Sequence, residues 1–262
     1  MMVHQSIRYR RLCKRPIRRR RRPKEDRGLP TDEELAKLAS FYLERQRRFW
    51  PQFVAEGLLP EPAAEVIKDM VASFKERQRR GEVDEAPLRA FLIGALKLGG
   101  AYSRYSCENS SPNSIADQLA NELNKAHSEG RFIPWAYVFA DFSVTGLDAT
   151  RQGYSSYKKV LAAKNSLIET TYIDDFTRAS RDELERWFLA TLSKRLNRRM
   201  VGASDGFRLN DSNWEMHVSI FGLLSRLFIK GLREKVKRGM KGAAERGTCL
   251  GKLALGFTKR ER

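Results

Sequence analysis

The sequence predicts an α/β protein built on a parallel β-sheet, with a small helical region before the sheet and a long helix after it. Strand-like and helix-like segments alternate between residues 98 and 211, as in a parallel sheet covered by helices. Residues 31–97 show only helical spacing, and residues 212–247 form one long amphipathic pattern. A basic arm, residues 1–30, precedes these parts, and a basic tail, residues 248–262, follows them.

The two ends of the chain carry almost all of its net positive charge. The 262 residues have a formal net charge of +18, and 41% of them are hydrophobic, which is enough for a core. Residues 1–30 contain 12 Lys and Arg against 2 Asp and Glu, and residues 226–262 contain 12 against 3. Basic ends on a nearly neutral middle indicate a polyanionic partner, most simply DNA. An anionic membrane surface is the competing partner, but no long apolar segment accompanies the charge.

The arm is expected to be disordered and the cysteines to be unpaired. The stretch KRPIRRRRRPK places like charges side by side between prolines, which break helices. Cys13, Cys107 and Cys249 are odd in number and far apart, so neither a disulfide framework nor a paired-cysteine zinc site is expected. The N-terminus lacks the apolar core of a secretory signal, which predicts a cytoplasmic, nucleoid-associated protein.

Three amphipathic helices are predicted between residues 31 and 97. The first covers residues 30–50, starts from Thr31 as a helix cap and has acidic residues in its first turn. The second covers residues 61–80 and the third covers residues 86–99. Apolar stripes at helical spacing are usually core, so a small bundle is favoured over a helix that reads DNA.

Four strands and three helices are predicted between residues 98 and 211. The strands are expected over residues 100–105, 134–141, 166–175 and 198–204, and the helices over residues 114–130, 153–165 and 180–197. Strands joined by helices run parallel, so their carboxyl ends meet at one edge of the sheet, where the sites of such proteins lie.

A single helix is predicted from about residue 212 to residue 245. Its apolar stripe consists of Trp214, Val218, Phe221, Leu224, Phe228 and Leu232. At 1.5 Å per residue this helix is ~50 Å long, which exceeds the width of a small domain. Its stripe is therefore expected to pack on a partner subunit, with its basic end on phosphates. The alternative is a helix that breaks at Gly222 or Gly231 and folds back on its own core.

Polar residues follow each predicted strand at the carboxyl edge of the sheet. In chain order they are Arg104, Ser106, Asp141, Arg151, Asp174, Asp175, Thr177, Arg178, Arg181, Ser204 and Asp205. No histidine lies at a strand end, which excludes a Ser-His-Asp triad, and no cluster of metal ligands or phosphate-cradling glycine loop is present. A serine hydroxyl among arginines remains, and this combination suits attack on a phosphodiester, because guanidinium groups stabilise the phosphoryl-transfer transition state.

Five motifs carry a resemblance to a known family. YSRYS, SIADQL, DFSVTGLDATRQGY, DDFTRASRD and FIKGLREKVKRGM occur in order between about residues 98 and 257. The sequence resembles the catalytic domain of serine recombinases, the family of resolvases, invertases and phage integrases, and is most like that of the large serine recombinases. The resemblance implies a resolvase-like parallel-sheet domain at residues 98–211. LGKLALGF, after the long helix, resembles the start of the linker to the recombinase domain of the large members.

The resemblance also implies roles for individual residues. Ser106 matches the nucleophile that leaves a 5′-phosphoserine, and Arg104, Arg178 and Arg181 match the arginines that hold the scissile phosphate. Arg151 matches a further active-site arginine. Gln118, Asp141 and Glu234 match polar residues of the site and of the long helix. Phosphate contacts are expected from Arg18, Arg19, Arg20, Arg21, Arg22, Lys235, Lys237, Arg238 and Lys241.

The family works without a metal, a nucleotide or another cofactor. The expected partners are double-stranded DNA and further copies of the chain, as a homodimer on each site and a tetramer at synapsis, with no membrane and no small-molecule substrate. The sequence departs from the family at three positions. Thr177 stands where an aspartate is usual, with Asp175 as its expected substitute; Lys235 replaces an arginine; and Cys107 follows the serine. Cys107 is the less suited nucleophile, because only Ser106 fits the motif.

The predicted function is site-specific DNA recombination with the chemistry at Ser106. The alternative is a truncated DNA-binding remnant that dimerises through the long helix and no longer recombines. An RNA-binding basic protein is a third possibility, but no module that stacks RNA bases is visible in the sequence.

Overall fold

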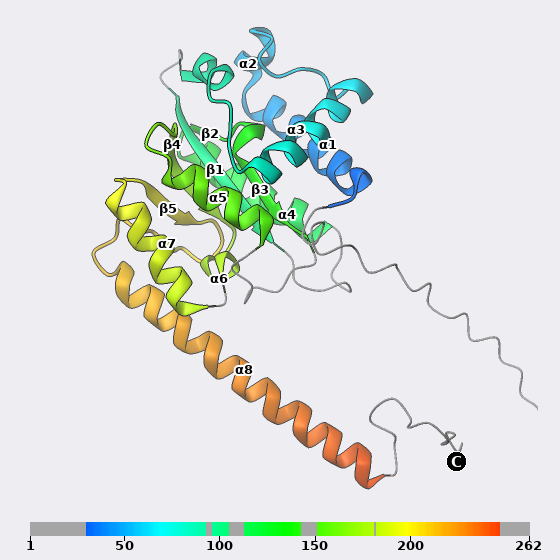
Figure 1. Ribbon diagram of the computed structural model, residues 1–262, viewed down its shortest axis with the longest axis vertical. Coiled ribbons are helices and arrows are strands. Elements are labelled where there is room, and N and C mark those ends of the chain that lie inside the picture. Colours follow the sequence, from blue (N-terminus) through cyan, green and yellow to red (C-terminus); the bar gives the residue numbers. More distant parts are fainter. Residues whose placement is uncertain (1–29, 93–95, 105–112, 143–150, 181, 247–262) are drawn as a thin grey trace, which may run out of the picture.

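The computed structural model shows a parallel sheet with helices on both faces and one helix that projects away from it (Figure 1). It describes residues 30–92, 96–104, 113–142, 151–180 and 182–246. The predicted arm up to residue 29, Ser106, Cys107, Arg181 and the basic tail lie outside the described residues.

The sheet confirms the predicted α/β class. Its centre is formed by β1 (Lys97–Arg104) and β4 (Ile168–Ile173), and β5 (Arg199–Gly202) pairs with β4. On the other side, β2 (Arg131–Phe132) pairs with the start of β1 and β3 (Val138–Asp141) pairs with its end. All four pairings are parallel. In a parallel sheet the carboxyl ends of the strands meet at one edge, and Arg104 and Asp141, the last residues of β1 and β3, lie at this edge.

The connections distribute three helices over the two faces. From β1 the chain continues through α4 (Asn113–Ser128) to β2 and β3, on one side of β1. It then crosses to the other side of β1 through α5 (Gln152–Ala162) and enters β4. It continues through α7 (Glu183–Arg195) to β5. Right-handed crossovers in opposite directions place their helices on opposite faces, so α4 covers one face while α5 and α7 lie together on the other (Figure 1).

The residues before the sheet form two long helices. In α1 (Asp32–Phe49) the side chain of Thr31 accepts from the Glu34 N–H, and the Glu34 carboxylate accepts from the Thr31 N–H at 2.8 Å, which is a complete capping box. A short α2 (Pro51–Ala55) follows. The next helix, α3 (Ala64–Arg80), ends at Gly81, whose φ of 71° is left-handed and suits glycine. The predicted cap and the first two predicted helices are confirmed.

Two of the predicted elements were wrong in form. The third predicted helix, residues 86–99, is a 3₁₀ helix (Pro87–Leu92), and residues 97–99 belong to β1, because the central strand offers them ladder hydrogen bonds. The predicted strand over residues 134–141 is a 3₁₀ turn (Trp135–Tyr137) followed by β3. Pro134 has no N–H to donate, and the chain leaves the sheet there before β3 resumes it.

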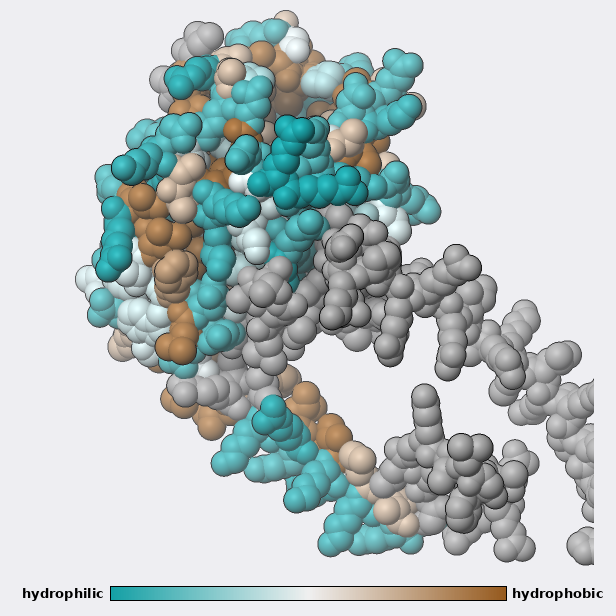
Figure 2. Space-filling view, in the orientation of Figure 1, coloured by the Kyte–Doolittle hydropathy of each residue, from teal (hydrophilic) through white to brown (hydrophobic). Residues whose placement is uncertain are grey.

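The long helix α8 (Trp214–Glu245) is continuous through Gly222 and Gly231 and does not fold back. Its first turns pack on α6 and α7, and its buried residues within the described side chains are Trp214, Val218 and Gly222. The remainder projects from the sheet with an apolar side and a hydrophilic side (Figure 2). None of the helices described is long and apolar enough to cross a membrane.

Candidate active site

The ends of β1 and β3 lie side by side at the carboxyl edge. Parallel pairing aligns the last residue of β1, Arg104, with the last residue of β3, Asp141. On the other side of β1, β4 ends at Ile173 and leads into Asp174 and a short helix, α6 (Phe176–Ala179). The sheet register therefore gathers residues from three separate parts of the sequence, as the sequence predicts.

Arg104 is hydrogen-bonded through both its backbone and its side chain and is 4% exposed. Its N–H donates to Oε1 of Gln118 at 3.0 Å, and its Nε donates to the backbone carbonyl of Arg178 at 2.9 Å. Gln118 is held in turn, since its Nε2 donates to the Ser114 carbonyl at 2.8 Å. The arginine that ends one central strand is thereby tied to the arginine that follows the other.

Arg178 is held at one end and open to solvent at the other. Its Nε lies 3.2 Å from Oδ2 of Asp174, and its side chain remains 40% exposed. Oδ1 of Asp174 accepts from Nδ2 of Asn121 at 2.9 Å and from the hydroxyl of Ser204. A guanidinium oriented by a carboxylate and accessible from outside can bind a phosphate.

Asp141 is fully buried and accepts three hydrogen bonds. Its Oδ1 accepts from the Gly153 N–H at 2.8 Å, and its Oδ2 accepts from the Tyr154 N–H and the Tyr102 hydroxyl, both at 2.9 Å. Burial raises the pKa of Asp141, whereas Arg151 and the hydrogen bonds oppose this shift. The carboxylate fastens the first turn of α5 to the end of β3.

Arg151 is buried beneath the edge of the sheet and is 2% exposed. Its Nη1 donates to the Tyr102 hydroxyl at 2.6 Å, and its Nη2 donates to the Ala179 carbonyl at 2.7 Å. The guanidinium also lies 4.6 Å from the centroid of the Tyr154 ring. In this arrangement Arg151 joins β1, α5 and α6, and it positions the segment that carries Arg178.

The carboxylate that pairs with Arg178 differs from the expected one. Asp175 turns to the start of α6, where it accepts from the N–H and the hydroxyl of Thr177 at 2.7 and 2.6 Å. The first N–H groups of a helix lack partners within it, so a preceding aspartate is drawn to them. Asp174 is four residues before Arg178 and takes the pairing role instead. Asp205 adds a second acceptor at this helix, for the Phe176 N–H at 2.8 Å.

Glu122 is a site residue that the sequence analysis missed. It is fully buried in α4, one turn after Gln118. Its Oε2 accepts from the hydroxyl of Ser103 at 2.9 Å and its Oε1 accepts from the Asp174 N–H at 3.0 Å. Burial raises the pKa of Glu122 well above its ordinary value, and the charge of Asp174 adds to the shift. Glu122 links Ser103, near the end of β1, to Asp174, which follows β4.

Several predicted residues lie away from this edge or outside the described residues. Glu234 is exposed on α8, ~30 Å along the helix from Trp214. The basic residues predicted to contact phosphates on the same helix, Lys235, Lys237, Arg238 and Lys241, are exposed. Arg18–Arg22, Ser106 and Arg181 are in segments that the structure does not describe.

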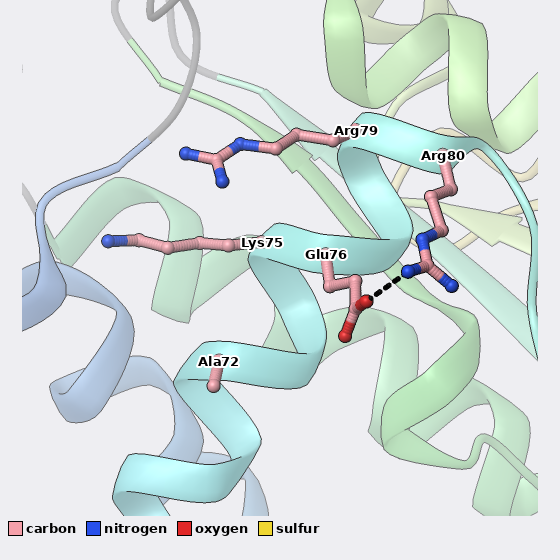
Figure 3. A pocket seen from close by; sticks show the side chains of 5 residues that line it. All are labelled: Ala72, Lys75, Glu76, Arg79 and Arg80. Atoms are coloured by element: carbon pink, nitrogen blue, oxygen red, sulfur yellow. Dashed lines mark ion pairs between the residues drawn. The ribbon is translucent and has the colours of Figure 1, made fainter.

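A charged hollow on α3 is separate from the polar edge. It is lined by Ala72, Lys75, Glu76, Arg79 and Arg80, all from the outer face of one helix (Figure 3). Glu76 and Arg80 form an ion pair of 2.7 Å between exposed side chains, which is typical of a solvated helix face. Across the described residues, no three His, Cys, Asp or Glu side chains group in a way that could hold a metal ion.

Comparisons with known proteins relate this chain to one family. The crystal structure of the N-terminal catalytic domain of TP901-1 integrase is similar at a TM-score of 0.41 and 16% identity, over 52% of this chain and 99% of that one. No curated protein matches. The sequence model of the family "Resolvase, N terminal domain" matches residues 100–249, which is more than half of the chain and spans the sheet and α8. The protein is therefore a member of the resolvase family of serine recombinases.

Proposed function

We propose that this protein is a site-specific DNA recombinase in which Ser106 attacks the DNA backbone. The observation that carries the proposal is the placement of Arg104 and Arg178. Arg104 ends the central strand two residues before Ser106, and its side chain is bonded to the backbone of Arg178. The Arg104 guanidinium and the backbone of Arg178 thus meet at the end of the strand that precedes Ser106 in the sequence.

The proposed reaction exchanges one phosphodiester for another. The Ser106 oxygen forms a bond to phosphorus and loses its proton, while the bond from phosphorus to the 3′ oxygen breaks and that oxygen gains a proton. The products are a 5′-phosphoserine and a free 3′-hydroxyl, and attack by a 3′-hydroxyl on the phosphoserine reverses the step. Arg178, together with Arg104 and Arg181, stabilises the negative charge on the phosphate oxygens during both steps.

Helix α8 supports the proposed assembly on DNA. Its exposed apolar side chains are Met216, Ile220, Leu223, Leu224, Leu227, Phe228, Leu232, Val236 and Met240. A stripe of this length on a helix that leaves its own domain suits a second copy of the chain, which would cover it. The basic residues from Lys235 onward would then lie against phosphates.

A covalent-trapping assay tests the chemistry. The protein is incubated with supercoiled DNA that carries a candidate site, denatured, and analysed for DNA bound covalently to protein. The wild type and Cys107→Ala are expected to form the adduct, whereas Ser106→Ala is expected to form none. An adduct with Ser106→Ala would refute the assignment of the nucleophile. DNA binding without an adduct from the wild type would instead favour the recombination-inactive remnant.

A further inference from the structure

Among the described residues, no strand pairs with the outer side of β3, so β3 forms an edge of the sheet. Both β2 and β3 pair with β1, which lies on their inner side. Alternate residues of a strand direct their carbonyl groups to the same side, so Val138 and Ala140 share the outer side of β3. Buried carbonyl groups at such an edge need donors from elsewhere in the protein.

The helices before the sheet supply these donors through side chains. Nη2 of Arg77 donates to the Val138 carbonyl and Nε2 of Gln78 donates to the Ala140 carbonyl, both at 2.6 Å. Farther along the edge, the Ile133 carbonyl accepts from the Tyr42 hydroxyl at 2.8 Å and from Nε2 of Gln46 at 2.7 Å. All four donor side chains are buried. Side chains of α1 and α3 thus replace the missing neighbouring strand.

The charge of this region argues against a role in phosphate binding. Residues 30–92 contain 10 Lys and Arg against 12 Asp and Glu, while the excess positive charge of the protein lies at its two ends. The outer face of α3 carries exposed charges of both signs, and Glu76 and Arg80 form an ion pair in its last turns (Figure 3). Its inner face, with Phe74, Arg77 and Gln78, is buried.

The α3 contacts lead directly to the polar edge. Gln78 bonds to the residue before Asp141, and the Ser156 hydroxyl of α5 donates back to the Gln78 carbonyl at 2.6 Å. At Gly153 a Cβ atom would lie 2.4 Å from Nε2 of Gln78 and 2.5 Å from the Ala140 oxygen, so α3, β3 and the first turn of α5 are in close contact. Gly153 is also the residue whose N–H Asp141 accepts.

We propose that residues 30–92 are a built-in brace for the active site, and that Gln78 is a positioning residue of the DNA-cleavage reaction. Gln78 fixes the end of β3 and, through Asp141, the first turn of α5. Asp141 and Arg151 share the Tyr102 hydroxyl, and Arg151 holds α6 through the Ala179 carbonyl. The brace thereby sets the position of the segment that carries Arg178. The assignment to cleavage rests on the proposed function, whereas the bracing itself does not.

The test compares two glutamines that brace the same edge at different distances from the site. Gln78→Met and Gln46→Met each remove one buried donor and keep a side chain of similar length. Both are expected to lower the melting temperature, because each loses one buried hydrogen bond. The Ile133 carbonyl keeps the Tyr42 hydroxyl as a donor in Gln46→Met, whereas the Ala140 carbonyl loses its side-chain donor in Gln78→Met. Only Gln78→Met is expected to raise amide exchange at Gly153 and Tyr154, by about tenfold, the effect of one buried hydrogen bond. It should also slow adduct formation at saturating DNA by a similar factor.

The outcomes separate the brace from the proposed chemistry. Equal exchange at Gly153 and Tyr154 in the two variants would overturn the positioning role of Gln78, whatever the activity. If the wild type forms no adduct, the proposed function fails, while the exchange measurement still decides the brace. Should Gln78→Met not fold, Ser156→Ala cuts the α3 contact from the side of α5 and is compared with Gln46→Met in the same way. Unchanged exchange in Ser156→Ala would then refute the proposal.

Discussion

Replacing Asp141 by asparagine is expected to destabilise the polar edge strongly. The amide has one acceptor oxygen and one NH₂ group, whereas the two oxygens of Asp141 accept from the N–H groups of Gly153 and Tyr154. Whichever way the amide turns, its NH₂ faces one of these donors. The substitution also removes the negative charge beside Arg151, which is 2% exposed.

The expected loss follows from these two changes. A hydrogen bond to a charged group contributes ~1.5–3 kcal/mol, and one such bond is replaced by a contact between donors. Removing the carboxylate beside a buried cation raises the total loss of stability to ~3–5 kcal/mol. We expect Asp141→Asn to lower the free energy of unfolding by ~3 kcal/mol or more. Adduct formation should fall as well, because Arg151 and α6 lose their anchor.

Urea denaturation followed by circular dichroism measures this loss. The matched control is Asp175→Asn, which changes a half-buried cap of a four-residue helix and is expected to cost less than ~1 kcal/mol, because asparagine caps a helix about as well as aspartate. A loss of less than ~1 kcal/mol in Asp141→Asn, or one no larger than that of Asp175→Asn, would refute the argument that Asp141 is the anchor of α5 and Arg151.

Three further predictions concern Glu122 and α8. Burial raises the pKa of Glu122 above its ordinary 4.5, so the contribution of Glu122 to stability is fully present below pH 4.5 and is lost as the pH rises toward the folded pKa, by up to ~1.4 kcal/mol per pH unit. Glu122→Gln should flatten this fall in urea titrations at several pH values; an unchanged slope would contradict the assignment. Phe228→Glu should shift sedimentation from dimer to monomer, whereas Lys230→Glu should not. Exchanging Lys235, Lys237, Arg238 and Lys241 for glutamine should reduce the salt dependence of DNA binding by roughly 0.9 in log–log slope per lost phosphate contact, and an equal slope would exclude them as contacts.

Periodic patterns predicted most elements because each depends on neighbours in the sequence. The capping box at Thr31 and Glu34 lies within one turn, and the stripe of α8 repeats along a single helix. The predictions were wrong for segments whose structure depends on partners that are distant in the sequence. Residues 97–99 joined β1 rather than a helix because β2 and β4 offered them ladder bonds.

The candidate site likewise combines features that the sequence predicts with features that depend on tertiary contacts. Its arginines could be placed at the strand ends, because parallel strands joined by helices must end at one edge. The role of each side chain depended on contacts across the sequence. Glu122 reaches Asp174 over 52 residues, and Arg104 reaches Arg178 over 74. Asp174 rather than Asp175 pairs with Arg178, because the start of α6 takes the second carboxylate for its own N–H groups.

The sequence by itself determined the class of fold, the edge of the sheet that carries the arginines and the concentration of positive charge at the two ends. These depend on periodicity and composition, which are local or additive properties. Only the tertiary structure decided that the helices before the sheet brace its open edge. Arg77 and Gln78 appear in the sequence as charged and polar members of an amphipathic helix. They become donors to β3 because that edge strand holds buried carbonyl groups, more than sixty residues away, that no neighbouring strand in the described part of the chain satisfies.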